Sequence, residues 1–480
     1  MKRQRFWIPL ILVGAIVLQG LASPTGSFRT YQQVVVTDGD EEDDWDEDMP
    51  DFSLWSKDSL QQYSDSMLKL LQDSVEFDFI RVETNDTIQK KVDSVYREMF
   101  LADSLARAKS EFEKEFAAWI GAKGAVTVSN GTAALHVALT ALGIGSGDEV
   151  ICTSYSFIAS SFCAVQAGAL PVFCDTGTDH LMDPKKIEAL ITKRTKAIVV
   201  VHLYGMVADM DPIMKIAKKH KLYVIEDCAQ CFGGVYKGKK AGTIGTVGCF
   251  SFCQSKHFTT GGEGGMVCCN DDDLAWEIRS VRDHGYDVKA KLNLLQMEGK
   301  QLYIHRRVGY NFRMTEIQSA IGLGELQRFD KWNLPQRKKL GKALIKGLQG
   351  HPLIKYMPVD TKERQNSFWL VPFVLDTSKL KCTMKEFIAA VQAEGACAYS
   401  VLWPEMYKEE AFAKRKGFGK SCYPFKDPAH RKIDYTKFNC EMAHSMADAT
   451  ISFWTHPTYT LAHIEADVKA FKKVAAAMMK

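Results

Sequence analysis

This 480-residue chain has almost no excess of charge of either sign, and its N-terminal part has no cysteine. The 61 basic residues nearly balance the 58 acidic ones, giving a net charge of +3, and the basic residues are spread along the chain. This distribution argues against a nucleic-acid partner and favours a small molecule. None of the 13 cysteines precedes Cys152, and many lie in apolar, strand-like runs. Such placement is typical of the reduced, buried thiols of a cytosolic protein.

Long apolar runs are also scarce, and an uncharged one lies at the start. It covers residues 6–22 and follows three basic residues, which predicts a signal peptide or a membrane anchor over residues 1–23. Residues 24–52 include the stretch from Asp38 to Asp51, which has ten acidic residues and no basic one and predicts a disordered acidic linker. Residues 1–23 indicate export or membrane contact, whereas the buried, reduced cysteines indicate the cytoplasm. The sequence therefore leaves the location of the protein open.

Glycine is absent from residues 53–108, where apolar residues recur at helical spacing. The pattern predicts one or two amphipathic helices of unknown role. From residue 109 to 337 the chain alternates helical segments with apolar strands, which predicts an α/β domain whose mostly parallel sheet is flanked by helices. Residues 338–480 predict a smaller C-terminal α+β domain.

In such sheets ligands bind where strands end and helices begin, so the residues just after each strand are the candidates. Gly131 and Thr132 open a helix, where free N–H groups favour an anion such as phosphate, although a plain helix cap fits the same pattern. Asp227 ends an apolar strand, where its alternative role is to cap a following helix. Lys256 lies between another strand and the glycine-rich segment TTGGEGG.

A lysine can be an ordinary solvated side chain, but in a desolvated site it forms a Schiff base with an aldehyde. An anion cradle, a strand-end carboxylate and a strand-end lysine are the groups that pyridoxal 5′-phosphate requires. Two other motifs are weaker. The pair Cys228 and Cys231 has no second pair at zinc-site spacing, and residues 233–240 approach a P-loop pattern but place Lys240 where serine or threonine should stand, which favours a hairpin turn.

From about Glu111 onward the chain resembles the DegT/DnrJ/StrS family of sugar aminotransferases, which are fold-type-I pyridoxal-phosphate enzymes. Seven blocks carry the resemblance, in the order of the family: SNGTAALHVAL, SYSFIAS, VHLYGMVADMDPI, VIEDCAQ, FSFCQSKHFTTGGEGGMV, GYNFRMTEIQSAIG and HPTYT. The resemblance implies transfer of an amino group from an amino acid, such as glutamate, to a keto sugar that is usually linked to a nucleotide.

The resemblance also implies roles for individual residues around the cofactor. Lys256 would bind the cofactor aldehyde and move the proton during transfer. Asp227 would pair with the pyridine nitrogen, Gln230 would hydrogen-bond the phenolic oxygen, and Phe157 would stack on the ring. These are the roles that a pyridoxal site needs to hold its ring and to keep it an electron sink.

The phosphate end involves a second set of residues. Ser251 would bind the phosphate together with the backbone at Gly131 and Thr132. Asn311 would reach the phosphate of the neighbouring subunit, which implies a homodimer with shared active sites.

Two alternatives stay open at this point. In related sugar dehydrases a histidine takes the place of the lysine, and here His257 directly follows Lys256. The spacing from Ser251 and from Asp227 selects Lys256 and favours amino transfer. The second alternative is a non-catalytic, membrane-tethered relative that binds cofactor or sugar, which the anchor-like prefix favours and the full set of cofactor residues disfavours. The basic segment from Lys414 to Lys432 raises the further question of a phosphorylated substrate, with a solvated loop as its plainer explanation.

Overall fold

The computed structural model describes residues 102–287, 304–400 and 405–480, with side chains from Ala108 onward in the first range. The predicted signal peptide or anchor at 1–23, the acidic linker at 24–52 and nearly all of the helical segment at 53–108 lie outside these ranges. Among the described residues, no helix combines the length and the apolar character needed to cross a membrane.

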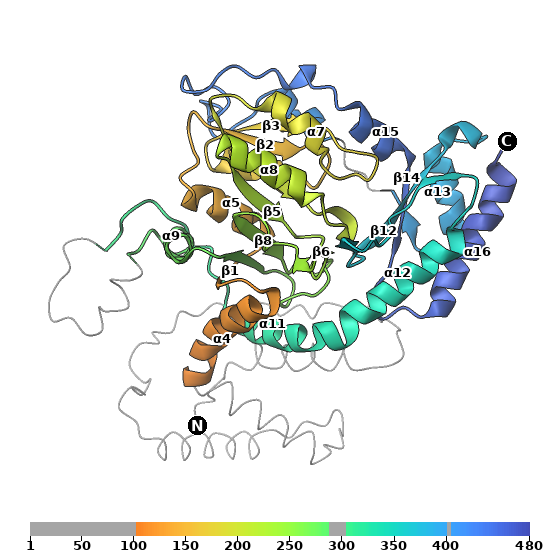
Figure 1. Ribbon diagram of the computed structural model, residues 1–480, viewed down its shortest axis with the longest axis horizontal. Helices are drawn as coiled ribbons and strands as arrows, with labels where there is room; N and C mark the ends of the chain where they lie inside the picture. The colour runs from red at the N-terminus through yellow and green to blue at the C-terminus, as the bar shows by residue number, and fades with distance from the viewer. Residues whose placement is uncertain (1–101, 288–303, 401–404) are drawn as a thin grey trace, which may run out of the picture. The chain divides into compact units, whose positions relative to one another are not determined.

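A seven-stranded sheet forms the centre of the fold (Figure 1). Its strands, in spatial order, are β1 (Gly124–Val128), β9 (Gly265–Cys269), β8 (Val247–Ser251), β5 (Tyr223–Asp227), β4 (Thr195–Val201), β2 (Glu149–Thr153) and β3 (Leu170–Cys174). The strands from β8 to β3 pair in parallel, and only β9 runs against its neighbours in this sheet. The predicted α/β class with a mostly parallel sheet is confirmed.

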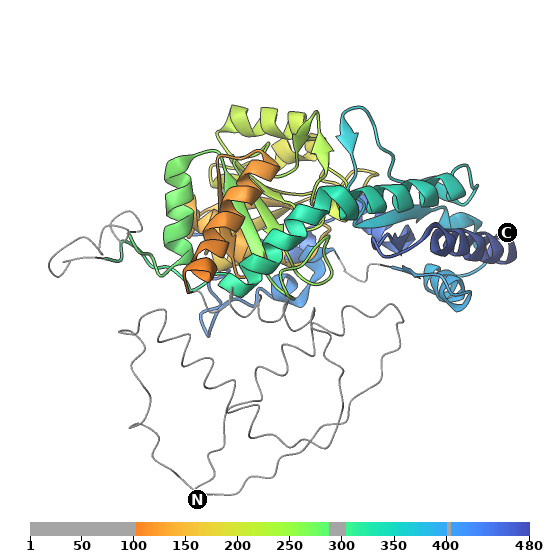
Figure 2. The ribbon, with the colours of Figure 1, turned by 90° about the horizontal axis from the view of Figure 1, so that it is seen from below.

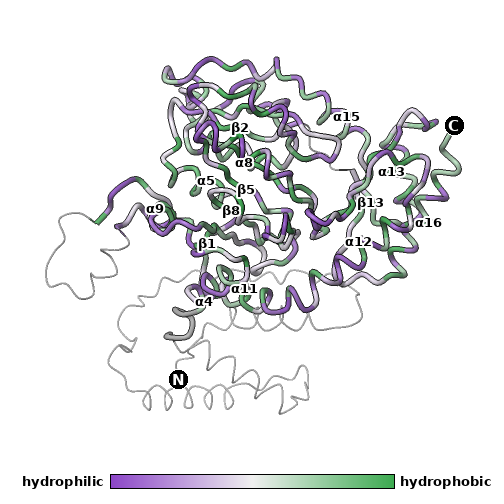
Figure 3. Tube along the Cα trace, viewed as in Figure 1, coloured by the Kyte–Doolittle hydropathy of each residue, from purple (hydrophilic) through white to green (hydrophobic). Residues whose placement is uncertain are grey.

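Helices cover this sheet, as the two perpendicular views show (Figures 1 and 2). They are α4 (Ala102–Ile120), α5 (Gly131–Ala141), α6 (Ala159–Gln166), α7 (Pro184–Ile187), α8 (Met210–His220), α9 (Asp272–Arg282) and α11 (Glu316–Arg328). Because both faces are covered, strands such as β2, β3 and β9 are buried along their whole length. The hydropathy tube accordingly shows green strands at the centre (Figure 3).

A second, antiparallel sheet is built from the C-terminal part of the chain. Its order is β10 (Ile354–Tyr356), β12 (Leu370–Leu375), β14 (Thr450–Trp454) and β13 (Ala398–Tyr399). Its apolar core also draws on α12 (Leu334–Leu348), α13 (Met384–Ala393) and α16 (Leu461–Met478). This is the α+β arrangement that the sequence predicts for residues 338–480.

The motif that approaches a P-loop is a hairpin. Strands β6 (Val235–Tyr236) and β7 (Lys239–Lys240) pair antiparallel, and β11 (Arg364–Gln365) extends them into a three-stranded sheet. The two turn residues, Lys237 and Gly238, have φ of 48° and 81°. Positive φ at both central residues is the geometry of a tight two-residue hairpin. The hairpin prediction is therefore confirmed.

Part of the C-terminal region packs on the large sheet. Short helices α14 (Glu410–Ala413) and α15 (Glu441–Ala449) flank the basic segment, and Tyr407, Phe412 and Tyr435 belong to the large core. Tyr435 donates to the carbonyl of Pro171, and Arg431 pairs with Glu149 at the start of β2. These contacts place the basic segment at the amino ends of the strands. Ligands in such sheets bind at the other edge, so this placement favours the solvated-loop interpretation.

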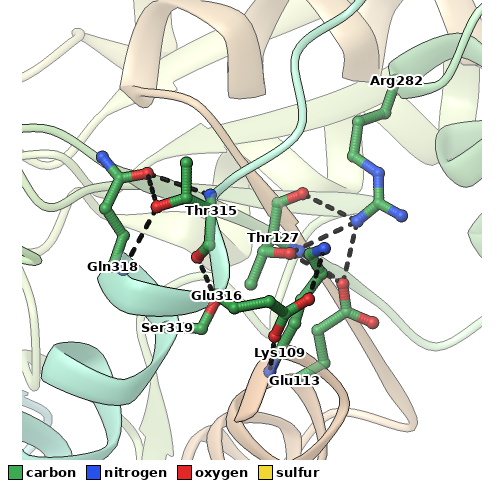
Figure 4. Close-up of polar contacts among 8 residues, drawn as sticks. All are labelled: Lys109, Glu113, Thr127, Arg282, Thr315, Glu316, Gln318 and Ser319. Carbon is green, nitrogen blue, oxygen red and sulfur yellow. Dashed lines mark hydrogen bonds and ion pairs between the residues drawn. The ribbon is translucent and has the colours of Figure 1, made fainter. Parts of the chain in front are cut away.

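Helix α4 is fixed to the sheet by a largely buried acidic side chain, that of Glu113 (Figure 4). Glu113 accepts bonds from the N–H and the hydroxyl of Thr127, at 2.9 Å each, and pairs with Arg279 at 2.8 Å and Arg282 at 2.9 Å. Closer to the start of the helix, Lys109 binds the carboxylate of Glu316 through both its backbone N–H and its side chain. The side chain of Glu113 is only 12% exposed, so these bonds are largely desolvated.

Replacing Glu113 by alanine should destabilise the protein by about 3 kcal/mol, because two largely buried guanidinium groups would lose their only carboxylate partner among the described residues. The free energy of unfolding, measured with denaturant, checks this. Glu111→Ala is the matched control, since Glu111 is an exposed glutamate of the same helix. Equal stability of the two variants would contradict the expectation.

Acid should weaken the fold through buried histidines. Burial lowers the pKa of His180 to about 3, and that of His136 to about 4. An unfolded histidine titrates near pH 6.5, so the stability is complete above that pH and falls as the pH drops towards the folded-state pKa. At pH 5 each of the two histidines should lower the free energy of unfolding by about 2 kcal/mol relative to its value above pH 6.5. His180→Asn tolerates the φ of 63° at this position and should reduce the stability difference between pH 8 and pH 5 by that amount. An unchanged difference would refute this.

Candidate active site

A cavity of about 580 Å³ lies at the carboxyl ends of the central strands. It is lined by seven of the eight predicted site residues: Gly131, Thr132, Phe157, Asp227, Gln230, Ser251 and Lys256. Asp227 is the last residue of β5 and Ser251 the last residue of β8, while Gly131 and Thr132 begin the helix that follows β1. The parallel strands thus bring to one place residues that are more than one hundred positions apart.

Asn311, the eighth predicted residue, does not line this cavity. It is exposed and forms an isolated bridge with Asp283. Its expected partner was the phosphate of a neighbouring subunit, and that expectation stays a prediction.

The N-terminus of α5 forms one end of the cavity. Asn130 caps the helix, with its side-chain oxygen 2.8 Å from the N–H of Ala133. No described residue accepts a hydrogen bond from the N–H of Gly131 or Thr132. A Cβ added to Gly131 would lie 2.6 Å from the Cβ of Ser251, so glycine is needed for this close approach. Two free N–H groups, a nearby hydroxyl and the positive helix end together suit a phosphate group.

Asp227 lies in the interior of the cavity and is 4% exposed. Its carboxylate accepts from the hydroxyl of Ser160 at 2.8 Å and from the N–H of Ala229 at 3.1 Å. Burial raises the pKa of Asp227, against the opposing effects of Ser160, Ala229 and the charge of Lys256. No helix follows Asp227 directly, so the alternative of a helix cap is wrong. In the described part of the chain no cation lies within ion-pair distance of this carboxylate, which suits a cationic ligand group.

The neighbouring Glu226 has a purely structural environment. Its carboxylate accepts from the N–H groups of Gly242 and Ile244, and from His202 at 2.9 Å. His202 in turn accepts from the N–H of Ala208 through Nδ1, which places its proton on Nε2. His202, Glu226 and Cys228 lie close enough together to suggest a metal site. Both nitrogens of the histidine are already used, however, so this cluster does not fit a metal ion.

Gln230 is held with its amino group available. The N–H of Tyr204 donates to its side-chain oxygen at 3.1 Å, which fixes the amide orientation, and the side chain is buried at the cavity wall. Its NH₂ group can therefore donate to an anionic oxygen in the cavity. Phe157 is 49% exposed and contributes an aromatic ring to the cavity wall.

Lys256 projects into the cavity, whereas His257 does not. The Lys256 ammonium nitrogen lies 4.2 Å from the centre of the Trp369 ring. Burial lowers the pKa of Lys256, while the charges of Asp227, Cys253 and Glu263 oppose this. His257 is fully buried outside the cavity, against Phe329. The geometry therefore supports Lys256, and not His257, as the residue that faces the cofactor.

Sequence reasoning missed several residues of the cavity. Trp369 directly precedes strand β12, and Ser160 and His136 come from helices. Only their place in the blocks SYSFIAS and SNGTAALHVAL could have indicated the latter two, and Trp369 lies within an apolar run without a polar signal.

The residues present fit pyridoxal phosphate. A phosphate cradle, an unpaired buried carboxylate, an amide donor and a half-buried lysine face one cavity. Each of these groups matches one chemical feature of the cofactor: its phosphate, its pyridine nitrogen, its phenolic oxygen and its aldehyde.

Comparison with known proteins points to the same chemistry. GDP-perosamine synthase of Caulobacter vibrioides is 47% identical over 239 residues, which cover 50% of this chain and 61% of that protein. GDP-perosamine synthase of Escherichia coli O157:H7 is 38% identical over 58% of this chain and 72% of its own length. The dTDP-3-amino-3,4,6-trideoxy-alpha-D-glucose transaminase of Streptomyces venezuelae is 37% identical over 58% of this chain and 68% of that protein.

A solved structure is similar over a greater length. The aminotransferase from Psychrobacter cryohalolentis superposes with a TM-score of 0.71 at 34% identity, covering 81% of this chain and 97% of that one. Residues 83–465 match the sequence profile of the DegT/DnrJ/EryC1/StrS aminotransferases. The chain therefore belongs to the DegT/DnrJ/EryC1/StrS aminotransferase family and is a pyridoxal-phosphate-dependent enzyme of fold type I.

Proposed function

We propose that this protein transfers an amino group from an amino acid, glutamate in the simplest case, to a keto sugar linked to a nucleotide. The observation that carries the proposal is the meeting of Lys256 and Asp227 in one cavity with the free N–H groups of α5. The three relatives named above act on nucleotide-linked sugars by their names, which supports a carrier of this class.

Each site residue has a defined task in this proposal. Bound pyridoxal phosphate supplies an electron sink that stabilises negative charge on the carbon that loses its proton. The N–H groups of Gly131 and Thr132, with the Ser251 hydroxyl, bind the phosphate. Asp227 keeps a proton on the ring nitrogen, because a buried carboxylate favours a cation beside it. Gln230 donates to the phenolic oxygen, and Phe157 stacks on the ring.

Lys256 has two tasks. Its amine anchors the cofactor in the resting enzyme, and during transfer it takes the proton from the substrate carbon and returns it. Burial favours the neutral, nucleophilic form of the amine, which both tasks require.

We further propose that two copies of the chain share their active sites. Asn311 is exposed outside its own cavity, and Phe157 is 49% exposed. Ile317 and Ile321, one turn apart on α11, are 58% and 40% exposed, which gives the surface an apolar stripe. A dimer is expected in light scattering after gel filtration, and Asn311→Ala should weaken cofactor binding in that dimer. A monomer with full activity would contradict the shared site.

The central experiment is a direct assay. The purified full-length protein is incubated with pyridoxal phosphate, glutamate and a panel of nucleotide-linked keto sugars, and mass spectrometry follows the amino sugar and 2-oxoglutarate. Formation of both products in equal amounts supports the proposal. Loss of a sugar hydroxyl without consumption of glutamate would instead indicate a dehydrase. A protein that neither binds the cofactor nor consumes glutamate would be a non-catalytic relative.

Gly131→Ala should lower the affinity for pyridoxal phosphate by at least about fivefold, because overpacking of this size costs about 1 kcal/mol or more. The added methyl group would lie 2.6 Å from Ser251 and occupy the space beside the free N–H groups. Gly145→Ala is the control, since a Cβ there makes only an ordinary contact, 3.6 Å from the carbonyl oxygen of Ala167. Cofactor fluorescence during titration measures both affinities. Equal affinities would argue against a phosphate site at this helix end.

A further inference from the structure

The peptide carbonyls on both sides of Lys256 are held by side chains from distant parts of the chain. Trp369 donates its indole N–H to the carbonyl of Ser255 at 2.6 Å. Asn333 donates its amide to the carbonyl of His257 at 2.6 Å. The backbone that carries the lysine is thus fixed from two directions, and one of the two supports also contacts the lysine side chain.

That support is Trp369, whose ring faces the Lys256 ammonium at 4.2 Å. The indole is itself held in place. Its backbone N–H donates to the carbonyl of Tyr204 at 3.1 Å, and its ring packs edge-to-face on Trp454 with 6.1 Å between the centroids. The side chain is 6% exposed and lines the cavity. A rigid, desolvated aromatic face attracts a cation more strongly than a solvated one.

A second group, the carboxylate of Asp227, also attracts the ammonium of Lys256, and an ion pair between the two would compete with the cofactor. Asp227 is the buried carboxylate that the ring nitrogen of the cofactor needs, and its charge acts on Lys256. No carboxylate among the described residues lies within ion-pair distance of the lysine amine. When the ammonium of Lys256 lies over the Trp369 ring, Asp227 remains unpaired and can bind the ring nitrogen of the cofactor.

We propose that Trp369 is a positioning residue that receives the ammonium of Lys256 over its ring whenever the amine is not bonded to the cofactor. This inference rests on the proposed function of Lys256. When the amine takes the proton from the substrate carbon it becomes an ammonium group, and the ring of Trp369 holds that group in the cavity until the proton is returned. Binding over the ring stabilises the charged form and keeps it from pairing with Asp227.

The test uses the full-length protein without cofactor and measures the labelling of Lys256 by an amine-reactive anhydride as a function of pH. Mass spectrometry of the peptide gives the rate, which follows the neutral fraction of the amine. Asp227, Cys253 and Glu263 also act on this amine, and His257 is its neighbour. All four stay unchanged in the Trp369 variants.

Trp369→Leu removes both the aromatic face and the indole N–H, whereas Trp369→Phe keeps a face and removes only the N–H. We expect Trp369→Leu to label about tenfold faster near neutral pH, with a lower apparent pKa of Lys256, and Trp369→Phe to stay within about threefold of the wild type. Circular dichroism confirms the fold of both variants. Trp332→Leu, at an exposed tryptophan outside the cavity, is the control.

Two outcomes would overturn the proposal. In the first, the two Trp369 variants behave alike, which would assign the effect to the hydrogen bond with Ser255. In the second, neither variant changes the apparent pKa. The labelling needs no amino transfer, so its failure can be told from a failure of the proposed function, which would appear as absent cofactor binding or absent product.

Discussion

Lys256→Ala should lose amino transfer by a factor of at least about 10⁴, the largest effect of any single change in this protein. The variant lacks both the amine that anchors the cofactor aldehyde and the base that moves the proton. No other lysine lines the cavity in the described part of the chain, so no neighbour can replace it. Product formation in the glutamate assay measures the loss.

Covalent trapping makes this expectation specific. Borohydride reduces the bond between the cofactor aldehyde carbon and the lysine nitrogen, and digestion then locates the label, which should be on Lys256. Lys338→Ala is the matched control, because Lys338 is also half-buried with a pKa lowered by burial, yet lies outside the cavity. This control should keep both label and activity. A label on another amine, or an active Lys256→Ala protein, would refute the assignment.

The position of the site followed from a general property of parallel sheets. Gly131, Asp227, Ser251 and Lys256 all lie just at or after the end of a strand, and parallel strands present these ends at one edge. Local sequence thus predicted Gly131, Asp227 and Lys256 as one set, whereas Ser251 came from the family resemblance. It could not distinguish a helix cap from a cofactor contact at Asp227, because that depends on whether a helix follows.

Residues from other layers were beyond such reasoning. Trp369 directly precedes strand β12 of the second sheet, 113 positions after Lys256, and nothing in an apolar run signals which residue will face a cavity. The docking of that sheet decides its position. In the same way, residues 405–443 lie within the predicted C-terminal domain, yet Tyr407 and Phe412 pack in the large core. Which core receives an aromatic side chain is a property of the folded chain, so the domain boundary stays a prediction.

Asp227→Asn should reduce kcat by about 10³-fold while changing cofactor affinity by no more than about tenfold. An asparagine has the same shape and can accept from the N–H of Ala229 while its amino group donates to the Ser160 hydroxyl, but it carries no charge to hold a proton on the ring nitrogen. The phosphate cradle and Lys256 remain, so binding should survive. Pre-steady-state kinetics with glutamate and a cofactor titration measure the two effects separately.

Ser160→Ala separates the charge of this carboxylate from its orientation. The variant keeps the negative charge of Asp227 but removes the 2.8 Å hydrogen bond that holds it. A hydrogen bond to a charged group contributes about 1.5 to 3 kcal/mol, so a loss of roughly tenfold to a hundredfold in kcat is expected, smaller than that of Asp227→Asn. If the serine variant were as impaired as the asparagine variant, orientation rather than charge would be the essential property. If Asp227→Asn kept kcat within tenfold of the wild type, the ring nitrogen would not depend on a carboxylate at all.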